Sequence, residues 1–331
     1  MARSSCLIFN PAAGQGDSEQ ELQTICQLLS PHMELEVRLT SPDRDAAPLA
    51  RTAVDQNFDL IIAAGGDGTV SAVAAALIGT SISLGVIGRG TANAFANALG
   101  IPTSLEAACC VITEGTTRVV DAASCGDSAM ILLAGIGLEA ETIRNADRVA
   151  KDRLGVLAYV LAGFRQLQDL ELFAAELEID GSRKVEFSAG AITVANAAPA
   201  TSILAQGPAG VIPDDGLLDL TIVAPESTLD IMAASYNLLR SALRGEAATQ
   251  ESVGYLRAKH FKITTQPAQR VMIDGELVGH TPIEITCIPH SLTVCTPRSN
   301  MEQPKQLQER LENLPDLSVS PSLASRDIDL T

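Results

Sequence analysis

Aromatic residues are scarce in this chain of 331 residues: they make up 3% of it, and tryptophan is absent. Alanine, valine, isoleucine and leucine must therefore supply the core, a balance that suits helices packed closely on a sheet. Net positive charge is also lacking, because the formal net charge is −17. A general nucleic-acid binder needs a basic face to displace phosphate counterions. We therefore expect no nucleic-acid partner and no polybasic attachment to anionic lipid.

Long apolar runs and zinc-type cysteine patterns are lacking too. No apolar run reaches the roughly 18 residues of a membrane-spanning helix, and the first one ends at Asn10-Pro11, which argues against a signal peptide. The seven cysteines form no paired C-x-x-C motifs, so no zinc site is expected. We therefore expect a cytoplasmic protein with reduced cysteines and no transmembrane segment.

The first third of the sequence alternates strand-like and helix-like segments. Strands are predicted at 6–9, 35–39, 60–64 and 83–87, and helices at 18–29, 70–78, 92–99 and 102–114. The last two of these strands carry no charge, as buried strands of a parallel sheet require. The β-α repetition predicts a helix-covered parallel sheet over residues 1–124.

After about Asp121 the pattern changes to strands punctuated by turn residues such as Asp180-Gly181 and Asp274-Gly275. Strands are predicted at 119–124, 130–135, 175–179, 185–195, 218–223, 255–264, 270–273 and 283–287, and helices at 139–147, 154–168 and 229–243. This predicts a second, mainly antiparallel domain over residues 125–298. Residues 299–331 are polar, contain proline and are weakly periodic, so we expect a disordered tail.

The strongest local signal is Gly-Gly-Asp-Gly-Thr at 65–69, between a predicted buried strand and a helix. Glycines let the backbone turn sharply and approach a ligand, and a helix N-terminus offers free N–H groups to phosphate. The Asp67 carboxylate would be repelled by a bare phosphate, so a Mg²⁺ ion between them is implied. The plainer alternative is a glycine-rich turn in which Asp67 caps the helix.

Two further glycine loops follow predicted strands, Asn-Pro-Ala-Ala-Gly-Gln-Gly at 10–16 and Gly-Arg-Gly-Thr-Ala-Asn at 88–93. Such loops gather at the carboxyl ends of parallel strands, where ligands bind. No Walker A sequence occurs, and the first loop is no complete G-x-G-x-x-G because Glu19 stands in the third glycine's place. Each of these two loops alone is a weak signal, but three glycine loops after successive strands predict a phosphate-binding edge.

In order, N-P-x-x-G-x-G, G-G-D-G-T and G-T-A-N-x-F-A resemble the diacylglycerol kinase catalytic family, which includes bacterial lipid kinases and sphingosine and ceramide kinases. The resemblance continues through Gly-Ile-Gly-Leu-Glu-Ala at 135–140, Asp-Gly-Leu-Leu-Asp at 215–219 and Asp-Gly-Glu at 274–276. It covers roughly residues 5–298 and leaves only the tail outside. The set is specific in combination, whereas G-G-D-G-T alone also occurs in NAD kinases and phosphofructokinases.

The resemblance implies both a fold and an activity. A three-layer α/β domain with a parallel sheet would bind ATP, and an antiparallel β-sandwich domain would pack beside it. A lipid presented at a membrane surface would enter the cleft between them. The implied reaction is Mg²⁺-dependent transfer of the ATP γ-phosphate to a lipid hydroxyl, by a cytoplasmic enzyme that associates transiently with membranes. Positioning, charge neutralisation and one carboxylate base suffice for this chemistry.

The resemblance also implies residue roles. Asp67 would hold Mg²⁺ through water with support from Asp121, and Asp274 or Glu276 would orient and deprotonate the lipid hydroxyl, with Asp274 the favoured base. The ATP site would be formed by residues of the three loops: Asn10, Pro11, Gly14, Gly65, Gly66, Gly68, Thr69, Gly90, Thr91 and Asn93. A second, structural divalent site would take the Asp215 carboxylate and the carbonyls of Ile212 and Leu217.

Two positions depart from the family pattern. Many bacterial members carry an aspartate of the metal network where this chain has Ala94. Sphingosine kinases resemble this chain there, because they carry Asn-Ala at the corresponding place. Losing that carboxylate weakens an indirect metal site and leaves the acceptor lipid in doubt. Glu139 in place of the commoner aspartate keeps the charge. Diacylglycerol, a sphingoid base, a monoacylglycerol and a polyprenol all stay open as acceptors, and so does the oligomeric state.

One alternative concerns the role of Asp274, because the Asp-Gly pair at 274–275 also fits a plain hairpin turn. Two others concern the function of the protein. An NAD kinase-like small-molecule kinase would share Asp67 and its glycine loop, but no segment resembles that family's T-P-T-G-S-T-A-Y. A non-catalytic nucleotide- or lipid-binding protein would account for Ala94, whereas the retained Asp67, Asp121, Asp274 and Glu276 favour an enzyme.

Overall fold

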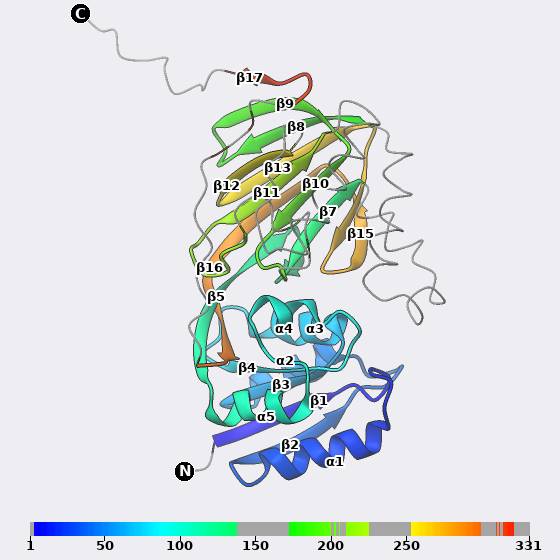
Figure 1. Cartoon of the computed structure of the whole chain (residues 1–331), viewed down its shortest axis with the longest axis vertical. Helices are drawn as coiled ribbons and strands as arrows, with labels where there is room; N and C mark the ends of the chain where they lie inside the picture. Colours follow the sequence, from blue (N-terminus) through cyan, green and yellow to red (C-terminus); the bar gives the residue numbers. More distant parts are fainter. Residues whose placement is uncertain are drawn as a thin grey trace, which may run out of the picture.

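The computed structural model describes residues 3–137, 172–199, 202, 205, 210–224, 253–298, 309, 311 and 314–320. Within them the chain forms a helix-covered parallel sheet at one end and packed antiparallel strands at the other (Figure 1). The predicted fold class, an α/β region with a parallel sheet followed by an antiparallel β-sandwich, is confirmed. The helices predicted at 139–147, 154–168 and 229–243 lie outside the described residues.

Four parallel strands form the centre of the N-terminal region. The strands are β1 Arg3–Phe9, β2 Met33–Leu39, β3 Leu60–Gly65 and β4 Ser83–Gly88. The helices are α1 Ser18–Leu29, α2 Ala46–Asp55, α3 Asp67–Leu77, α4 Ala94–Ala98 and α5 Leu105–Glu114. The strand order is β2-β1-β3-β4, and every residue of β3 and β4 is buried.

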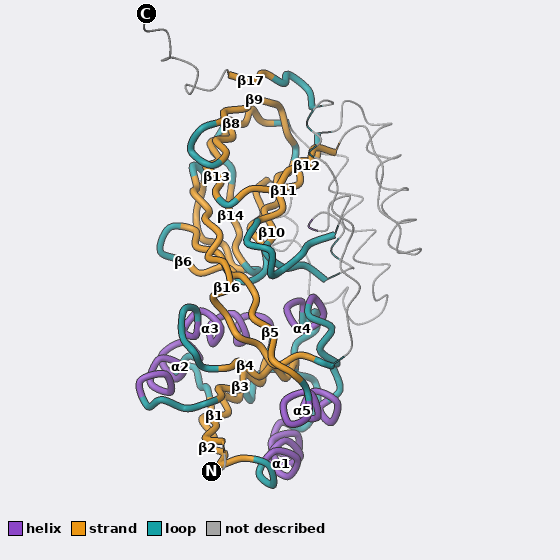
Figure 2. Tube along the Cα trace, turned by 90° about the vertical axis from the view of Figure 1, so that its left-hand side faces the viewer, coloured by secondary structure: helices purple, strands orange, loops and turns teal. Residues whose placement is uncertain are grey.

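Helices cover both faces of this parallel sheet. α1 and α5 pack on one face and α2 and α3 on the other (Figure 2), and Phe95 and Ala96 of α4 join the core cluster of α2 and α3. α2 was not predicted, and its start is set by Asp45, whose side chain accepts a hydrogen bond from the Ala46 N–H at 2.8 Å. Pro48 lies in its first turn, where a missing N–H costs nothing. The three-layer arrangement leaves the carboxyl ends of the strands uncovered for the glycine loops.

The remaining described residues build two antiparallel layers. One layer contains β5 Thr116–Cys125, β6 Ser128–Met130, β8 Phe173–Ile179, β9 Arg183–Ala189, β13 His260–Gln266, β16 Ile283–Thr296 and β17 Ser318–Ser320. The other contains β7 Leu133–Gly137, β10 Ala191–Ala195, β11 Leu218–Val223, β12 Val253–Ala258, β14 Arg270–Ile273 and β15 Glu276–His280. The second layer has the order β12-β11-β10-β7-β14-β15.

Two long strands join the antiparallel layers to the parallel sheet. β16 pairs antiparallel with β5 and β13 and, near its carboxyl end, parallel with β4. Figure 1 shows β5 and β16 running from one region into the other. A shared core of aliphatic side chains and phenylalanines fills the space between the antiparallel layers. The parallel sheet and the antiparallel layer that contains β16 therefore form one continuous sheet, which fixes the two regions relative to each other.

Several expectations need correction. The strands predicted at 130–135, 185–195 and 255–264 are each divided between the two layers, because the chain changes layer between β6 and β7, between β9 and β10 and between β12 and β13. The prediction of a disordered tail is wrong for the part of the tail that the structure describes. Leu311 and Leu314 are buried in the core between the two antiparallel layers, and β17 pairs with the edge strand β9. Two leucines three residues apart gain more from burial than this short segment gains from staying free.

Within the described part of the chain, no helix combines the length and the apolar character needed to cross a membrane.

Candidate functional site

The loops that follow β1, β3 and β4 lie side by side at the carboxyl edge of the parallel sheet. The Asn10 N–H donates to the Ala64 carbonyl at 2.9 Å, and the Arg89 N–H donates to the Gly65 carbonyl at 2.7 Å. A Cβ atom on Gly90 would lie 2.8 Å from the Cα of Gly66, so these two loops can touch only with glycine there. The structure thus brings together the three loops that the sequence marks as phosphate-binding.

Asn10 and Thr69 connect the first two loops. The Asn10 Nδ2 group donates to the Thr69 hydroxyl at 3.0 Å, and its Oδ1 accepts from the Ala12 N–H at 3.0 Å. Thr69 is buried beneath Gly65, where a Cβ atom would lie 2.6 Å from the threonine side chain. Both residues therefore hold the loops in shape, and their predicted contact with ATP stays a prediction.

Asp67 connects the second loop to the third. It is the first residue of α3, and its Oδ1 accepts a hydrogen bond from the Ala94 N–H at 2.6 Å. Ala94 begins α4, whose own N-cap residue Asn93 lies at φ +47° and makes no side-chain cap bond. Asp67 therefore caps α4 from a different helix, a role that sequence reasoning assigned only to its own helix.

Arg89 was not predicted as a site residue, although it lies between two glycines of the third loop. Its Nε donates to Glu21 Oε2 at 2.7 Å, its Nη2 donates to the same oxygen, and its Nη1 donates to the Asn10 carbonyl at 2.5 Å. Its guanidinium carbon lies 4.0 Å from the centroid of the Phe9 ring. A charged residue next to a buried strand is the signal that could have identified it, because such a charge needs a partner.

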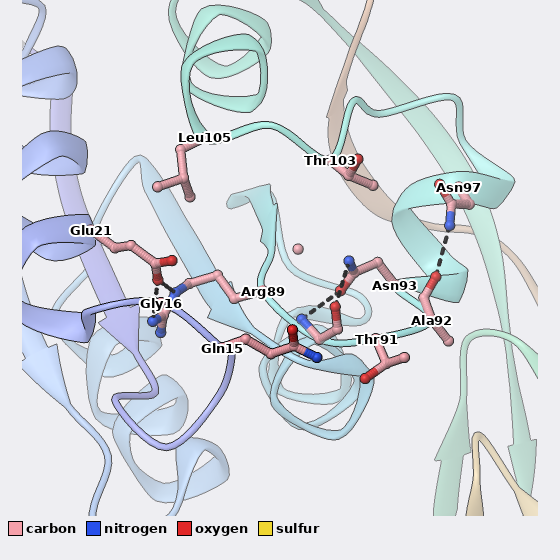
Figure 3. Close-up of a pocket in the computed structure, with 13 residues that line it drawn as sticks. Gln15, Gly16, Glu21, Arg89, Thr91, Ala92, Asn93, Asn97, Thr103 and Leu105 are labelled. Atoms are coloured by element: carbon pink, nitrogen blue, oxygen red, sulfur yellow. Dashed lines mark hydrogen bonds and ion pairs between the residues drawn. The ribbon is translucent and has the colours of Figure 1, made fainter. Parts of the chain in front are cut away.

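A cavity of about 520 Å³ opens between the first and third loops, as Figure 3 shows. Predicted ATP-site residues Gly14, Gly90, Thr91 and Asn93 line it, together with Arg89 and Glu21. Thr103 and Leu105, just before and at the start of α5, also line it and were not predicted. The volume suits a ligand of nucleotide size.

The Asp274 carboxylate is held by backbone N–H groups from a distant part of the chain. Oδ2 accepts from Ile131 at 2.9 Å, and Oδ1 accepts from Leu132 at 2.9 Å and from Leu133 at 3.0 Å. Asp274 and Gly275 both have positive φ and form the two-residue turn between β14 and β15, so the predicted hairpin is present. Burial raises the pKa of the Asp274 carboxyl to about 6, and the three N–H groups act in the opposite direction.

Glu276 follows this turn and approaches the second glycine loop. Its side chain is exposed, and its Oε1 lies 3.7 Å from the position of a Cβ atom on Gly68. Gly68 belongs to the first turn of α3, whose N–H groups point out of the helix. The structure therefore places the Asp-Gly-Glu turn against the Gly-Gly-Asp-Gly-Thr loop, as a reaction between a nucleotide and a second substrate would need.

The hydrogen bonds of Asp121 go to the turn at 213–216 and to His290. Asp121 is completely buried in β5, where its Oδ2 accepts from the Gly216 N–H at 2.6 Å and its Oδ1 accepts from the His290 N–H at 2.7 Å. The Asp121 N–H also donates to the Pro213 carbonyl at 2.7 Å. These contacts fix the 213–216 turn against β5 and β16. The predicted support of the Asp67 metal by Asp121 stays a prediction.

The acidic loop around Asp215 is paired with arginines. Asp215 Oδ1 accepts from the Leu217 N–H at 3.2 Å, and its Oδ2 accepts from the Arg257 guanidinium. Asp214 pairs with Arg118 at 2.7 Å. Both oxygens of the Asp215 carboxylate therefore have partners from this chain, and the divalent site predicted from Asp215, Ile212 and Leu217 stays a prediction.

The donor set of the first site suits a metal that arrives with a nucleotide. Among the described residues, no group of three or more His, Cys, Asp or Glu side chains could hold a metal ion by itself. Mg²⁺ is commonly bound by one or two carboxylates, water and substrate phosphates. Asp67, at the N-terminus of α3 with one oxygen on Ala94, fits that arrangement.

Comparisons with known proteins cover almost the whole chain. Residues 4–125 match the diacylglycerol kinase catalytic domain, and residues 133–296 match the YegS C-terminal NAD kinase beta sandwich-like domain. An uncharacterized protein of Synechocystis is 46% identical over 305 residues, which are 89% of this chain and 70% of that protein. A diacylglycerol kinase of Bacillus subtilis is 32% identical over 307 residues, covering 90% of this chain and 97% of that enzyme.

Solved structures agree with these matches. A putative diacylglycerol kinase from Bacillus anthracis superposes with a TM-score of 0.74 at 29% identity, covering 89% of this chain and 97% of that one. A yeast NADH kinase superposes with a TM-score of 0.53 at 14% identity, over 89% of this chain and 84% of that one, and this likeness concerns the fold alone.

Proposed function

The chain belongs to the diacylglycerol kinase-like lipid kinase family, and from this premise we propose that it transfers the γ-phosphate of ATP to a lipid hydroxyl. Diacylglycerol or a related lipid alcohol, such as a sphingoid base, is the proposed acceptor. The observation that carries the proposal is the approach of Glu276, next to Asp274, to the N-terminus of α3. Two residues before Glu276, burial raises the pKa of the Asp274 carboxyl to about 6.

The glycine loops and α3 supply the binding of the triphosphate. The first turn of α3 presents N–H groups without helical partners, and its dipole favours negative charge there. Gly65, Gly66 and Gly68 let phosphate oxygens approach the backbone closely. Mg²⁺ held near Asp67 would neutralise the charge that develops on the transferred group. The cavity between the first and third loops would take the remainder of ATP.

Asp274 would act as the general base. The lipid hydroxyl oxygen attacks the γ-phosphorus, its proton passes to the Asp274 carboxylate, and the bond between that phosphorus and the β–γ bridging oxygen breaks to release ADP. A pKa of about 6 leaves the carboxylate ionised at neutral pH yet basic enough to accept this proton. The N–H groups of residues 131–133 hold both carboxylate oxygens in one orientation.

The acceptor would be presented by a membrane, since the proposed lipids reside in bilayers, and the contact would be peripheral and transient. The Ala94 backbone N–H holds Asp67 whatever the side chain at position 94, which supports the proposed position of the Asp67 carboxylate. The carboxylate that many family members carry at position 94 is still missing, so the expected weakening of the metal site stays a prediction. The likeness to NADH kinase rests on the fold alone and offers no separate support for a nucleotide acceptor.

The test is transfer from γ-labelled ATP with Mg²⁺ to diacylglycerol, monoacylglycerol, a sphingoid base and a polyprenol in mixed micelles, with NAD⁺ as a parallel acceptor. The matched pair of variants is Asp274→Asn and Asp180→Asn. Asp180 also precedes a glycine in a hairpin turn, has positive φ and accepts two backbone N–H groups. It lies in the turn between β8 and β9, away from the glycine loops.

The proposal expects label on at least one lipid in the wild-type protein and in Asp180→Asn, and its near-complete loss in Asp274→Asn. Label on NAD⁺ alone would replace the lipid kinase with a small-molecule kinase. Binding of ATP without transfer to any acceptor would favour a non-catalytic nucleotide-binding protein.

A further inference from the structure

Arg89 and Glu21 form a buried ion pair that no part of the proposed reaction uses. The Arg89 side chain is 1% exposed and that of Glu21 25%. Two guanidinium nitrogens of Arg89 donate to one Glu21 oxygen, the third donates to the Asn10 carbonyl, and the group stacks on Phe9. Each of the three nitrogens thus has a partner within the protein, and these contacts hold the Arg89 side chain in one position.

We propose that Arg89 and Glu21, here called the Arg89–Glu21 clasp, are positioning residues that set the conformation of the first glycine loop and thereby the affinity for the nucleotide. The proposal rests on the proposed function, because it assumes that ATP occupies the cavity between the first and third loops. Both residues line this cavity (Figure 3).

The two glycines of the first loop lie against the clasp. A Cβ atom on Gly14 would be in ordinary van der Waals contact, 3.4 Å from the Arg89 carbonyl, 3.5 Å from its Nη2 and 3.6 Å from Glu21 Oε2, and it is the backbone φ of +89° that favours glycine there. A Cβ atom on Gly16 would lie 2.6 Å from Glu21 Oε1, so the Glu21 side chain would have to shift. The first loop therefore packs directly on the ion pair.

The clasp also joins three elements that are distant in sequence. Glu21 belongs to α1, Asn10 to the end of β1, and Arg89 to the loop after β4, which is 68 residues from Glu21. A buried arginine that loses its carboxylate leaves an uncompensated charge, so the loop would have to open to solvate it. An open loop must be ordered again before it can bind a nucleotide, which lowers the apparent affinity.

The variants Arg89→Met and Glu21→Gln break the clasp from either side, and Glu19→Gln is the matched control. Glu19 lies in the same first turn of α1 and is exposed. Binding of ATP with Mg²⁺ would be measured by calorimetry without any lipid. Hydrogen exchange of the amides in 12–16 would be measured with and without ATP. Circular dichroism and thermal unfolding would report whether each variant folds.

We expect the ATP dissociation constant and the KM for ATP to rise at least tenfold in Arg89→Met and Glu21→Gln. We also expect kcat at saturating ATP and the KM for the lipid to stay within about threefold of wild type. Amides in 12–16 should exchange faster and recover with ATP. The double variant should bind ATP no more weakly than the worse single variant, because the two residues act as one unit.

Folded variants with wild-type ATP affinity and wild-type exchange would overturn the proposal. If Arg89→Met does not fold, Glu21→Gln decides, because it keeps the size of a partly exposed side chain. Failure of the proposed function is a different result: the wild-type protein and Glu19→Gln would then show no ATP binding in the same titration, and the positioning role would be overturned with it.

Discussion

Replacing Asp274 by asparagine removes the charge of the proposed base and keeps its shape. The carboxylate accepts three backbone hydrogen bonds, from Ile131, Leu132 and Leu133. An asparagine can keep the two that reach Oδ1, while its NH₂ group faces the Ile131 N–H. General-base catalysis contributes about 10²–10⁴-fold, so the rate of transfer should fall by that factor.

The pKa of Asp274 sets how much kcat/KM should change with pH. Burial raises the pKa of Asp274 to about 6, so the ionised fraction is about 9% at pH 5 and about 91% at pH 7. If the carboxylate must be ionised, kcat/KM of the wild-type protein rises about tenfold between these two values. The residual activity of Asp274→Asn should lack this rise. The assay is labelled-phosphate transfer to the best acceptor at constant ionic strength.

Protein stability should follow the same titration with the opposite trend. The folded pKa of about 6 lies above the usual value of 3.8 for an aspartate, so the folded state binds more protons than the unfolded state between these two pH values. The contribution of Asp274 to the free energy of unfolding is therefore complete below the lower value and is lost as pH rises through the higher one. Between pH 5 and 7.5 the wild-type protein should lose about 1 kcal/mol relative to Asp274→Asn, as measured by urea unfolding.

Glu276→Gln is the control, because it changes the neighbouring carboxylate and leaves Asp274 in place. Whatever its absolute rate, Glu276→Gln should show the same rise of kcat/KM between pH 5 and 7 as the wild-type protein. A rise of the same steepness in Asp274→Asn, or a rate within about threefold of wild type, would refute Asp274 as the base and return the turn to a purely structural role.

Two further predictions concern Asp67 and the C-terminal segment. Asp67→Ala should lower transfer about 10²–10³-fold and, because Asp67 caps α4 through the Ala94 N–H, also destabilise the fold by about 0.5–2 kcal/mol. Asp67→Asn, which keeps an accepting oxygen, should lose the activity and keep most of the stability, and equal melting temperatures for all three proteins would contradict the cap. Leu314→Ala removes a side chain that is 6% exposed in the core between the antiparallel layers. It should lower the free energy of unfolding, measured in urea, by about 2–5 kcal/mol. A loss below about 0.5 kcal/mol would mean that the segment does not pack against the core.

Much of the fold could be predicted from local pattern. The uncharged runs at β3 and β4 and the regular spacing of the first strands and helices indicated a parallel sheet covered by helices. Such patterns are set by burial on both faces of each strand and need no knowledge of distant contacts. The break at Gly190 and the packed Leu311 and Leu314 were missed, because both depend on which layer a segment joins.

The position of the ligand-binding edge follows from the sequence alone. Glycine loops after successive parallel strands must meet at one edge of the sheet, and a glycine requirement such as that of Gly90 shows directly in the residue type. The order of the motifs was likewise enough to indicate the family.

The partners and the burial of each charged side chain follow from the tertiary structure and could not be predicted from the sequence. Arg89 pairs with Glu21 across 68 residues, Asp121 accepts hydrogen bonds from Gly216 and His290, and the pKa of Asp274 is raised by burial against a segment about 140 residues away. Hydrogen-bond partners and desolvation depend on neighbours in space, and those neighbours are brought together only when the layers pack.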